Sequence, residues 1–159
     1  MPDYVYLSQE GYDKLSKELD DLKHNKRPEI TKKIAEARAF GDLKENAEYH
    51  AAKEAQSVLE AKITQLEQTL RRAKILKRED MAEDRITILS RVKLKDLYRN
   101  VEVEYTLVSP QESDSRENKI STASPVGKAL LGKKIGDIIE IKVPAGTLKY
   151  QVVDLKLSI

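Results

Sequence analysis

The spacing of apolar residues changes about half-way along this chain of 159 residues, and no other feature constrains the fold as strongly. In the first half, apolar side chains recur every three or four positions, which is the period of one face of an α-helix. From about residue 85, apolar and charged residues alternate, as they do in strands with one buried face. The sequence therefore predicts an α+β protein, with a helical part at residues 1–80 and a small sheet domain at residues 81–159.

Residues 8 to about 80 predict two long helices joined as a hairpin. Ser8 is a good N-cap for the first helix, and Pro28 should bend this helix where the apolar spacing slips. Only a short break around Gly41 separates the helices, so we expect an antiparallel coiled coil. The expected contact positions are Leu15, Leu19, Leu22, Ile30, Ile34 and Ala37 in the first helix, Leu59, Ile63, Leu66, Leu70 and Ala73 in the second, and Ala47, Ala51, Ala52 and Ala55 near the break. The small alanines should let the two helices approach closely near the break.

The second half predicts an antiparallel sheet with one short helix. Four segments alternate in the manner of strands: residues 91–97, 101–108, 136–144 and 147–157. Ser124 should cap the short helix, Pro125 suits its first position, and Gly132 should end it. The polar segment 110–118 between them has no apolar anchor and predicts a loop.

Charge and cysteine content exclude several classes of protein. Lys and Arg number 29 and Asp and Glu number 27, whereas a protein that grips nucleic acid over its whole surface is far more basic. Any nucleic-acid contact must therefore be local. The sequence has no cysteine, which excludes disulfides, zinc–thiolate sites and cysteine nucleophiles. It also has no apolar run of membrane-spanning length and no signal-peptide pattern, so we expect a cytoplasmic protein.

The break between the helices reads "GDLKEN", residues 41–46, and its two acids have two interpretations. In the first, Gly41 ends one helix in a left-handed conformation, Asp42 caps the next, and Glu45 completes a capping box. In the second, the same spacing brings two carboxylates together as ligands for Mg²⁺. Two carboxylates leave this ion under-coordinated, so the second interpretation needs another molecule to supply the remaining ligands.

A longer run around these acids resembles a known family. Residues 34–56, "IAEARAFGDLKENAEYHAAKEAQ", resemble the hairpin tip of the bacterial Gre transcript-cleavage factors, and GreA more closely than GreB. The resemblance extends over almost the whole chain through "RPEI", "SPVGKALLGKKIGD" and "YQVVDLKL".

The resemblance implies a function carried out together with bacterial RNA polymerase. Gre factors insert the coiled coil into the secondary channel of a backtracked polymerase, where the tip acids, Asp42 and Glu45 by match of motif, share Mg²⁺ with the polymerase. The polymerase then cleaves the RNA near its extruded 3′ end by a two-metal mechanism. Magnesium is thus expected only jointly with the polymerase, and the chain, expected to be a monomer, is an accessory factor rather than an enzyme.

The resemblance also suggests contacts to RNA or polymerase around the acids. The candidates are Arg38, Lys44, Asn46, Tyr49 and Lys53. Asn46 could position water or phosphate, or simply be a polar residue of the first helical turn. Phe40 could stack on a base, pack on the channel wall or shield its own turn.

The second half resembles the FKBP-like domain that docks Gre factors at the channel rim. It offers tyrosines but no Phe or Trp, which argues against prolyl isomerase activity. Two other functions stay open: a channel-binding regulator that inhibits polymerase without cleavage, and an FKBP-like isomerase or chaperone with a coiled-coil arm.

Overall fold

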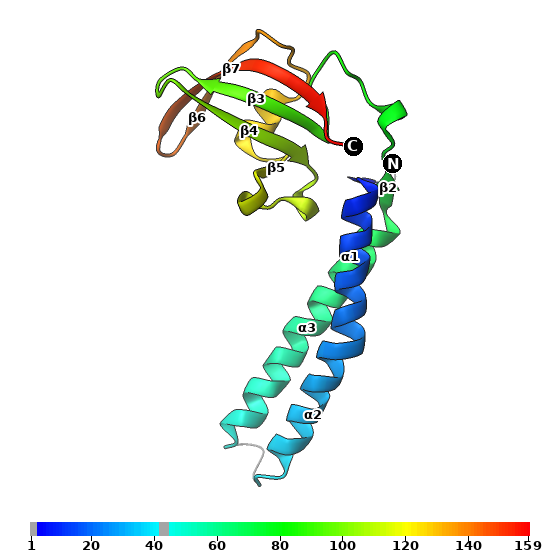
Figure 1. Cartoon of the computed structure of the whole chain (residues 1–159). Coiled ribbons are helices and arrows are strands. Elements are labelled where there is room, and N and C mark those ends of the chain that lie inside the picture. The colour runs from blue at the N-terminus through cyan, green and yellow to red at the C-terminus, as the bar shows by residue number, and fades with distance from the viewer. Residues whose placement is uncertain (1–2, 42–44) are drawn as a thin grey trace. The chain divides into compact units, whose positions relative to one another are not determined.

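The computed structural model describes residues 3–41 and 45–159, which divide into two compact units (Figure 1). One unit is helical and comprises residues 12–72. The other comprises residues 3–11 together with residues 73–159 and is built on strands. No helix in the described ranges is long and apolar enough to cross a membrane.

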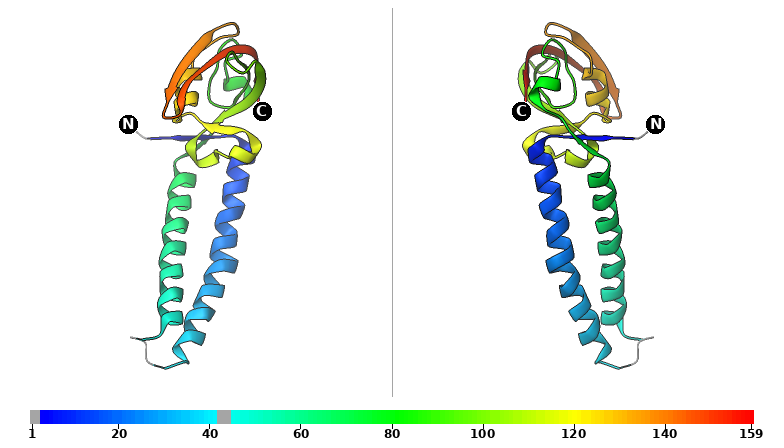
Figure 2. Two further views of the ribbon diagram at one scale, coloured as in Figure 1. Left: turned by 90° about the vertical axis from the view of Figure 1, so that its left-hand side faces the viewer. Right: turned by 90° about the vertical axis from the view of Figure 1, so that its right-hand side faces the viewer.

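The helical unit is the predicted antiparallel hairpin. Its first arm consists of α1 (Gln9–Asp21), a π-helical turn (Leu22–Lys26) and α2 (Arg27–Arg38), and its second arm is α3 (Ala47–Arg71). The two arms lie side by side in both views of Figure 2. Ion pairs cross between them from Glu18 to Lys62 and from Lys23 to Glu67.

The seam between the arms contains most of the predicted apolar residues. The buried ones are Leu15, Leu22, Ile34 and Ala37 in the first arm and Leu59, Ile63 and Leu66 in the second. Leu19, Ile30 and Leu70 are half-buried. The 3.6-residue period therefore identified the contact face correctly on both arms.

The π-helical turn explains the slip in spacing near Pro28. A π turn holds one residue more than an α turn, so it rotates the following helix relative to the preceding one. In a regular helix the seam position after Leu22 would be Lys26. The extra residue makes it Arg27 instead, and Ile30 and Ile34 then lie on the face that contacts the second arm. Pro28 stands in the first turn of α2, where its missing N–H costs little.

The end of the second helix was predicted wrongly. The helix ends at Arg71, and the following residues form the strand β2 (Ala73–Ile75) and a short 3₁₀ helix (Arg78–Asp80). β2 pairs in parallel with β1 (Val5–Leu7), a strand that the sequence analysis missed. Ala73 is thus a strand residue opposite Val5 and not a member of the helical seam.

The other unit contains a five-stranded sheet in the order β5-β4-β3-β7-β6. The strands are β3 (Ser90–Asp96), β4 (Val101–Val108), β5 (Lys119–Ser121), β6 (Ile138–Val143) and β7 (Gly146–Leu157). Neighbours are antiparallel as predicted, except that the short β5 runs parallel to β4. The helix α4 (Pro125–Leu130) contacts β5 and β6, and Leu130 joins the core of the sheet. Ser124 caps this helix as predicted, because its Oγ accepts a hydrogen bond from the Gly127 N–H at 3.1 Å.

The polar loop 110–118 does have an anchor, and it is a charged residue. Ser8 caps α1 by accepting from the Gly11 N–H at 2.9 Å, and its Oγ also donates to Glu112 Oε1 at 3.4 Å. The Glu112 carboxylate lies so close to Gly11 that a Cβ atom at that position would overlap it. Burial raises the pKa of Glu112, and its Oε2 has no hydrogen-bond partner among the described residues. Tertiary packing therefore partly buries a loop residue that the sequence alone would place in solvent.

The compact units and the predicted domains divide the chain at different residues. The prediction separated residues 1–80 from residues 81–159, whereas the units meet at Gly11 and Ala73. The difference arises because β1 and β2 pair with each other, and residues 3–11 group with the sheet unit.

Candidate functional site at the tip of the helical hairpin

Asn46 sets the start of α3. It has extended backbone angles, φ −87° and ψ 96°, and its Oδ1 accepts from the Tyr49 N–H at 3.1 Å. The prediction that Asp42 caps this helix and that Glu45 completes a capping box is therefore wrong. Asn and Asp cap about equally well, so the sequence offered two starting points, and the helix uses the later one.

Two consequences follow for the tip acids. Glu45 is exposed and lies in the turn before α3, and not on the helix as the predicted i, i+3 pair requires. Asp42 and Lys44 lie outside the described residues. The acid in the first turn of α3 is Glu48, which complements the positive end of the helix dipole.

Asn46 also reaches the other arm of the hairpin. Its Nδ2 donates to the Ala37 carbonyl oxygen at 2.6 Å, and this carbonyl belongs to the last turn of α2. This carbonyl also accepts from the Phe40 N–H at 3.1 Å, so the amide adds a second hydrogen bond to it from the other arm. The oxygen and the nitrogen of the Asn46 side chain are thus both engaged within the protein.

The first arm ends in tight turns. α2 ends at Arg38, and the N–H groups of Ala39, Phe40 and Gly41 donate to carbonyls three residues back. Gly41 has φ +114°, a value that favours glycine, so the predicted positive φ is confirmed while the helix ends earlier than predicted.

Three of the predicted RNA-contact residues lie near one another on the tip. The Arg38 guanidinium carbon lies 5.9 Å from the centroid of the Tyr49 ring, a cation–π distance that links the two arms. Lys53 follows Tyr49 by one helical turn and shares its face of α3. Its Nζ donates to Gln56 Oε1 at 3.2 Å. The His50 ring meets the Tyr49 ring edge-on, with centroids 5.8 Å apart.

An acidic hollow lies where α3 begins. It measures about 400 Å³ and is lined by Phe40, Glu45, Asn46, Ala47 and Glu48. Glu48 was not among the predicted site residues; its position three residues after Glu45 was the available signal. Within the described ranges, no group of three or more Asp, Glu, His or Cys side chains could hold a metal ion.

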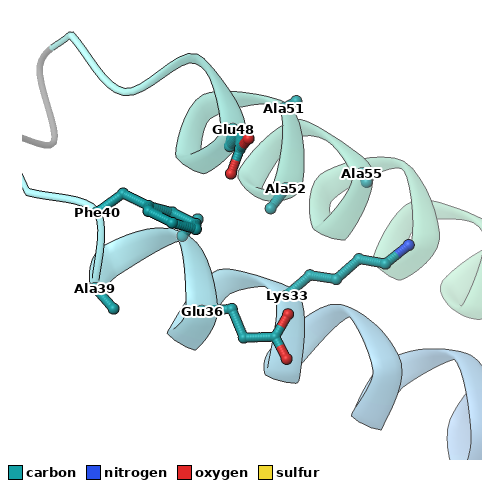
Figure 3. Close-up of a pocket in the computed structure, with 9 residues that line it drawn as sticks. Lys33, Glu36, Ala39, Phe40, Glu48, Ala51, Ala52 and Ala55 are labelled. Atoms are coloured by element: carbon teal, nitrogen blue, oxygen red, sulfur yellow. The ribbon is translucent and has the colours of Figure 1, made fainter.

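A second hollow, of about 690 Å³, lies on the apolar side of the tip (Figure 3). It is lined by Ala37, Ala39, Phe40, Ala51, Ala52 and Ala55, with Lys33, Glu36 and Glu48 around it. The Phe40 ring projects between the two helices and is 73% exposed. Ala51, Ala52 and Ala55, three of the alanines expected to let the helices approach closely, line this hollow.

Four basic residues of the first arm form ion pairs within the hairpin. Lys23 pairs with Glu67, and Arg27 forms two hydrogen bonds of 2.9 Å with Glu60. Lys26 pairs with Glu29 at 3.7 Å and Lys32 with Glu36 at 4.0 Å.

Comparison with known families accounts for nearly the whole chain. Residues 5–75 match the profile described as "Transcription elongation factor, N-terminal", and residues 81–157 match "Transcription elongation factor, GreA/GreB, C-term". The chain belongs to the GreA/GreB family. The gap between the two matched segments, residues 76–80, ends at the predicted boundary between residues 80 and 81.

Individual members of the GreA/GreB family align along their full length. A transcription elongation factor GreA of Chloroherpeton thalassium is 54% identical over 158 residues, which cover 99% of this chain and 100% of that protein. The GreA of Thermoanaerobacter pseudethanolicus is 48% identical over 96% of this chain and 97% of its own. Among solved structures, the GreA factor homolog 1 (Gfh1) of Thermus thermophilus is 33% identical, with 97% of this chain and 99% of that chain covered and a TM-score of 0.46.

Proposed function

We propose that this protein is a transcription elongation factor that inserts its hairpin tip into the secondary channel of RNA polymerase. There it stimulates the polymerase's own cleavage of backtracked RNA and so rescues arrested complexes. Its membership of the GreA/GreB family supports this, as do full-length relatives named transcription elongation factor GreA. We expect it to act in the cytoplasm as a monomer.

The observation that carries the proposal is the exposed position of Glu45 at the end of the hairpin. Because Asn46 caps α3, the fold gives Glu45 no capping role. A carboxylate exposed in a turn keeps its oxygens available to a hard cation such as Mg²⁺. With Asp42, which the motif pairs with it, Glu45 would supply part of a coordination shell that the polymerase and the RNA complete.

The chemistry of the donor set fits magnesium held jointly with a partner. Magnesium commonly takes one or two protein carboxylates and completes its shell with water and phosphate oxygens. When bound, it would supply charge stabilisation and an activated water for RNA hydrolysis. The residues of this chain would hold and orient the magnesium ion, and we expect them to catalyse no reaction without the polymerase.

The neighbouring basic and aromatic residues are suited to the extruded RNA. Arg38 and Lys53 bring positive charge to the face that contains the Tyr49 ring, and RNA recognition combines phosphate contacts with base stacking on aromatic rings. We propose Lys44, which lies outside the described residues, as a further contact. Asn46, whose side chain is engaged within the hairpin, is better explained by the fold than by an RNA contact.

We assign the sheet unit to docking at the channel rim. A cavity of about 560 Å³ beside α4 contains one aromatic ring, Tyr105, among its described lining residues, together with several serines. A prolyl isomerase pocket of the FKBP type is lined by aromatic rings, so this cavity favours docking over isomerase activity.

Cleavage of RNA in stalled elongation complexes tests the proposal. The protein should shorten the RNA in the presence of polymerase, and free RNA with the protein alone should stay intact. Inhibition without shortening would instead identify a regulator that blocks the channel. Hydrolysis of free RNA would contradict the accessory role.

A further inference from the structure

We propose that Asn46 is a positioning residue for cleavage, which acts by clamping the two arms of the hairpin beside Glu45. This inference rests on the proposed function, because it concerns how the tip presents its acid to the polymerase. It assigns Asn46 a role that differs from the predicted contact with RNA, water or phosphate.

The clamp consists of two hydrogen bonds made by one side chain. The amide nitrogen donates to the Ala37 carbonyl on α2 at 2.6 Å, and the amide oxygen accepts from the Tyr49 N–H on α3 at 3.1 Å. Both hydrogen bonds are partly buried, which protects them from competition with water. Asn46 therefore fixes the spacing between the last turn of one arm and the first turn of the other.

The clamped groups adjoin the residues proposed to act. Glu45 immediately precedes Asn46, so the hydrogen bond to Ala37 restrains the backbone from which its carboxylate projects. Tyr49 is held by its own N–H, and its ring faces Arg38, the residue next to Ala37. One side chain thus restrains both the acid and the aromatic–basic pair.

The amide nitrogen separates this role from simple capping. Asp and Ser both cap helices well, but an ionised Asp has no side-chain donor, and the Ser hydroxyl lies on a side chain one atom shorter than the amide, so neither reproduces the hydrogen bond to the Ala37 carbonyl. Asn46→Asp keeps the cap and places a carboxylate against a carbonyl oxygen. Asn46→Ser keeps the cap without adding charge. A capping role alone predicts that both variants behave like the wild type.

The experiment measures RNA cleavage in stalled polymerase complexes at increasing factor concentration and at two or more magnesium concentrations. We expect both Asn46 variants to melt close to the wild type and to compete normally for polymerase. Their maximal cleavage rate at saturating factor should fall by at least about tenfold, since small misplacements of a reacting group have large effects on rate. Their half-saturating magnesium concentration should rise, which a loss of stability alone would not cause.

Asn25→Asp is the matched control. The Asn25 amide donates to Asp21 Oδ1 at 2.7 Å on an exposed face of the first arm, so this variant makes the same chemical change away from the tip. It should cleave like the wild type. If both Asn46 variants keep the maximal rate and the magnesium dependence of the wild type, the proposed clamp is overturned. A wild-type protein that fails to cleave in the same assay would instead overturn the proposed function.

Discussion

The Arg27 guanidinium and the Glu60 carboxylate form two parallel hydrogen bonds of 2.9 Å, from Nε to Oε1 and from Nη2 to Oε2, across the two arms of the hairpin. Arg27 occupies the seam position that the π-helical turn creates, where the neighbouring positions are apolar. The paired geometry suits guanidinium and carboxylate, and lysine cannot reproduce it. Both side chains are close to half exposed, at 43% and 46%, so solvent weakens the interaction.

Replacing Arg27 with lysine should therefore destabilise the hairpin by a small but measurable amount, because one of the two hydrogen bonds is lost. Urea unfolding followed by circular dichroism measures this. Lys32→Ala is the control, since the Lys32 side chain is 79% exposed and its Nζ lies as far as 4.0 Å from Glu36 Oε1. This variant should change stability by less than about 0.5 kcal/mol. Equal effects of the two substitutions would contradict a specific role for the Arg27–Glu60 pair.

The tip acids should matter for cleavage and not for folding. Asp42→Asn and Glu45→Gln should each remove most of the stimulated cleavage, shift stability by no more than about 0.5 kcal/mol and leave competition for polymerase intact. Raising magnesium should partly restore cleavage, because metal affinity is what these variants lose. Asn46→Ala, by contrast, should cost about 1 kcal/mol of stability, since it removes the cap. Thermal melting and cleavage assays on the same proteins measure both effects, and a fully active Asp42→Asn would refute the proposed ligand.

Charge reversal at Lys53 should weaken cleavage at subsaturating factor while leaving the fold intact. Lys53 is exposed and shares the face of α3 that carries Tyr49, so a glutamate there would repel RNA phosphates. Stability should change by no more than about 0.5 kcal/mol. The comparison is Lys14→Glu, a reversal at an exposed position on α1. If both reversals reduce cleavage equally, overall charge and not a local contact is responsible.

Gly11→Ala should push the Glu112 carboxylate aside, because the added Cβ overlaps it, and since the displaced atoms end a flexible side chain the loss of stability should be at most about 1 kcal/mol. The second variant, Glu112→Ala, removes the obstructing group, so the double variant should lose less than the sum of the two single losses. Chemical denaturation of the three proteins gives this coupling. Additive losses would show that Gly11 and Glu112 do not meet in solution.

Glu112 should also make stability depend on pH. Burial raises the pKa of this carboxyl above its ordinary value of 4.5, with a further raising effect from Glu10 and lowering effects from Lys119 and Ser8. Because this pKa is higher in the folded state than in the unfolded state, the folded protein binds the proton more tightly. The resulting contribution to the free energy of unfolding is complete below pH 4.5 and is lost as pH rises through the folded-state pKa. The stability of Glu112→Gln relative to the wild type should therefore be higher at pH 7 than at pH 4. Glu140→Gln, at an exposed position on β6, is the control.

The hairpin could be predicted from sequence because its contacts repeat along the chain. Leu59, Ile63 and Leu66 mark one face of a helix by spacing alone, and the packing confirms them. The start of α3 could not be decided in this way, because Asp42 and Asn46 are both suitable caps in sequence, and the hydrogen bond from Asn46 to Ala37 in the other arm leaves no local pattern. The pairing of Val5 with Ala73 and the burial of Glu112 likewise arise between residues far apart in sequence, which no local pattern records.

The π-helical turn at Leu22–Lys26 makes the first arm equivalent to a regular heptad helix that contains one additional residue. Removing any one of residues 23–26 would leave Leu22 and Ile30 separated by seven positions, the interval of an uninterrupted coiled coil. The inserted residue is therefore accommodated where it occurs, as a local widening of the helix, and the pairing of every later residue with α3 is preserved. A long hairpin that must keep its distal end in register can in this way tolerate a change in chain length.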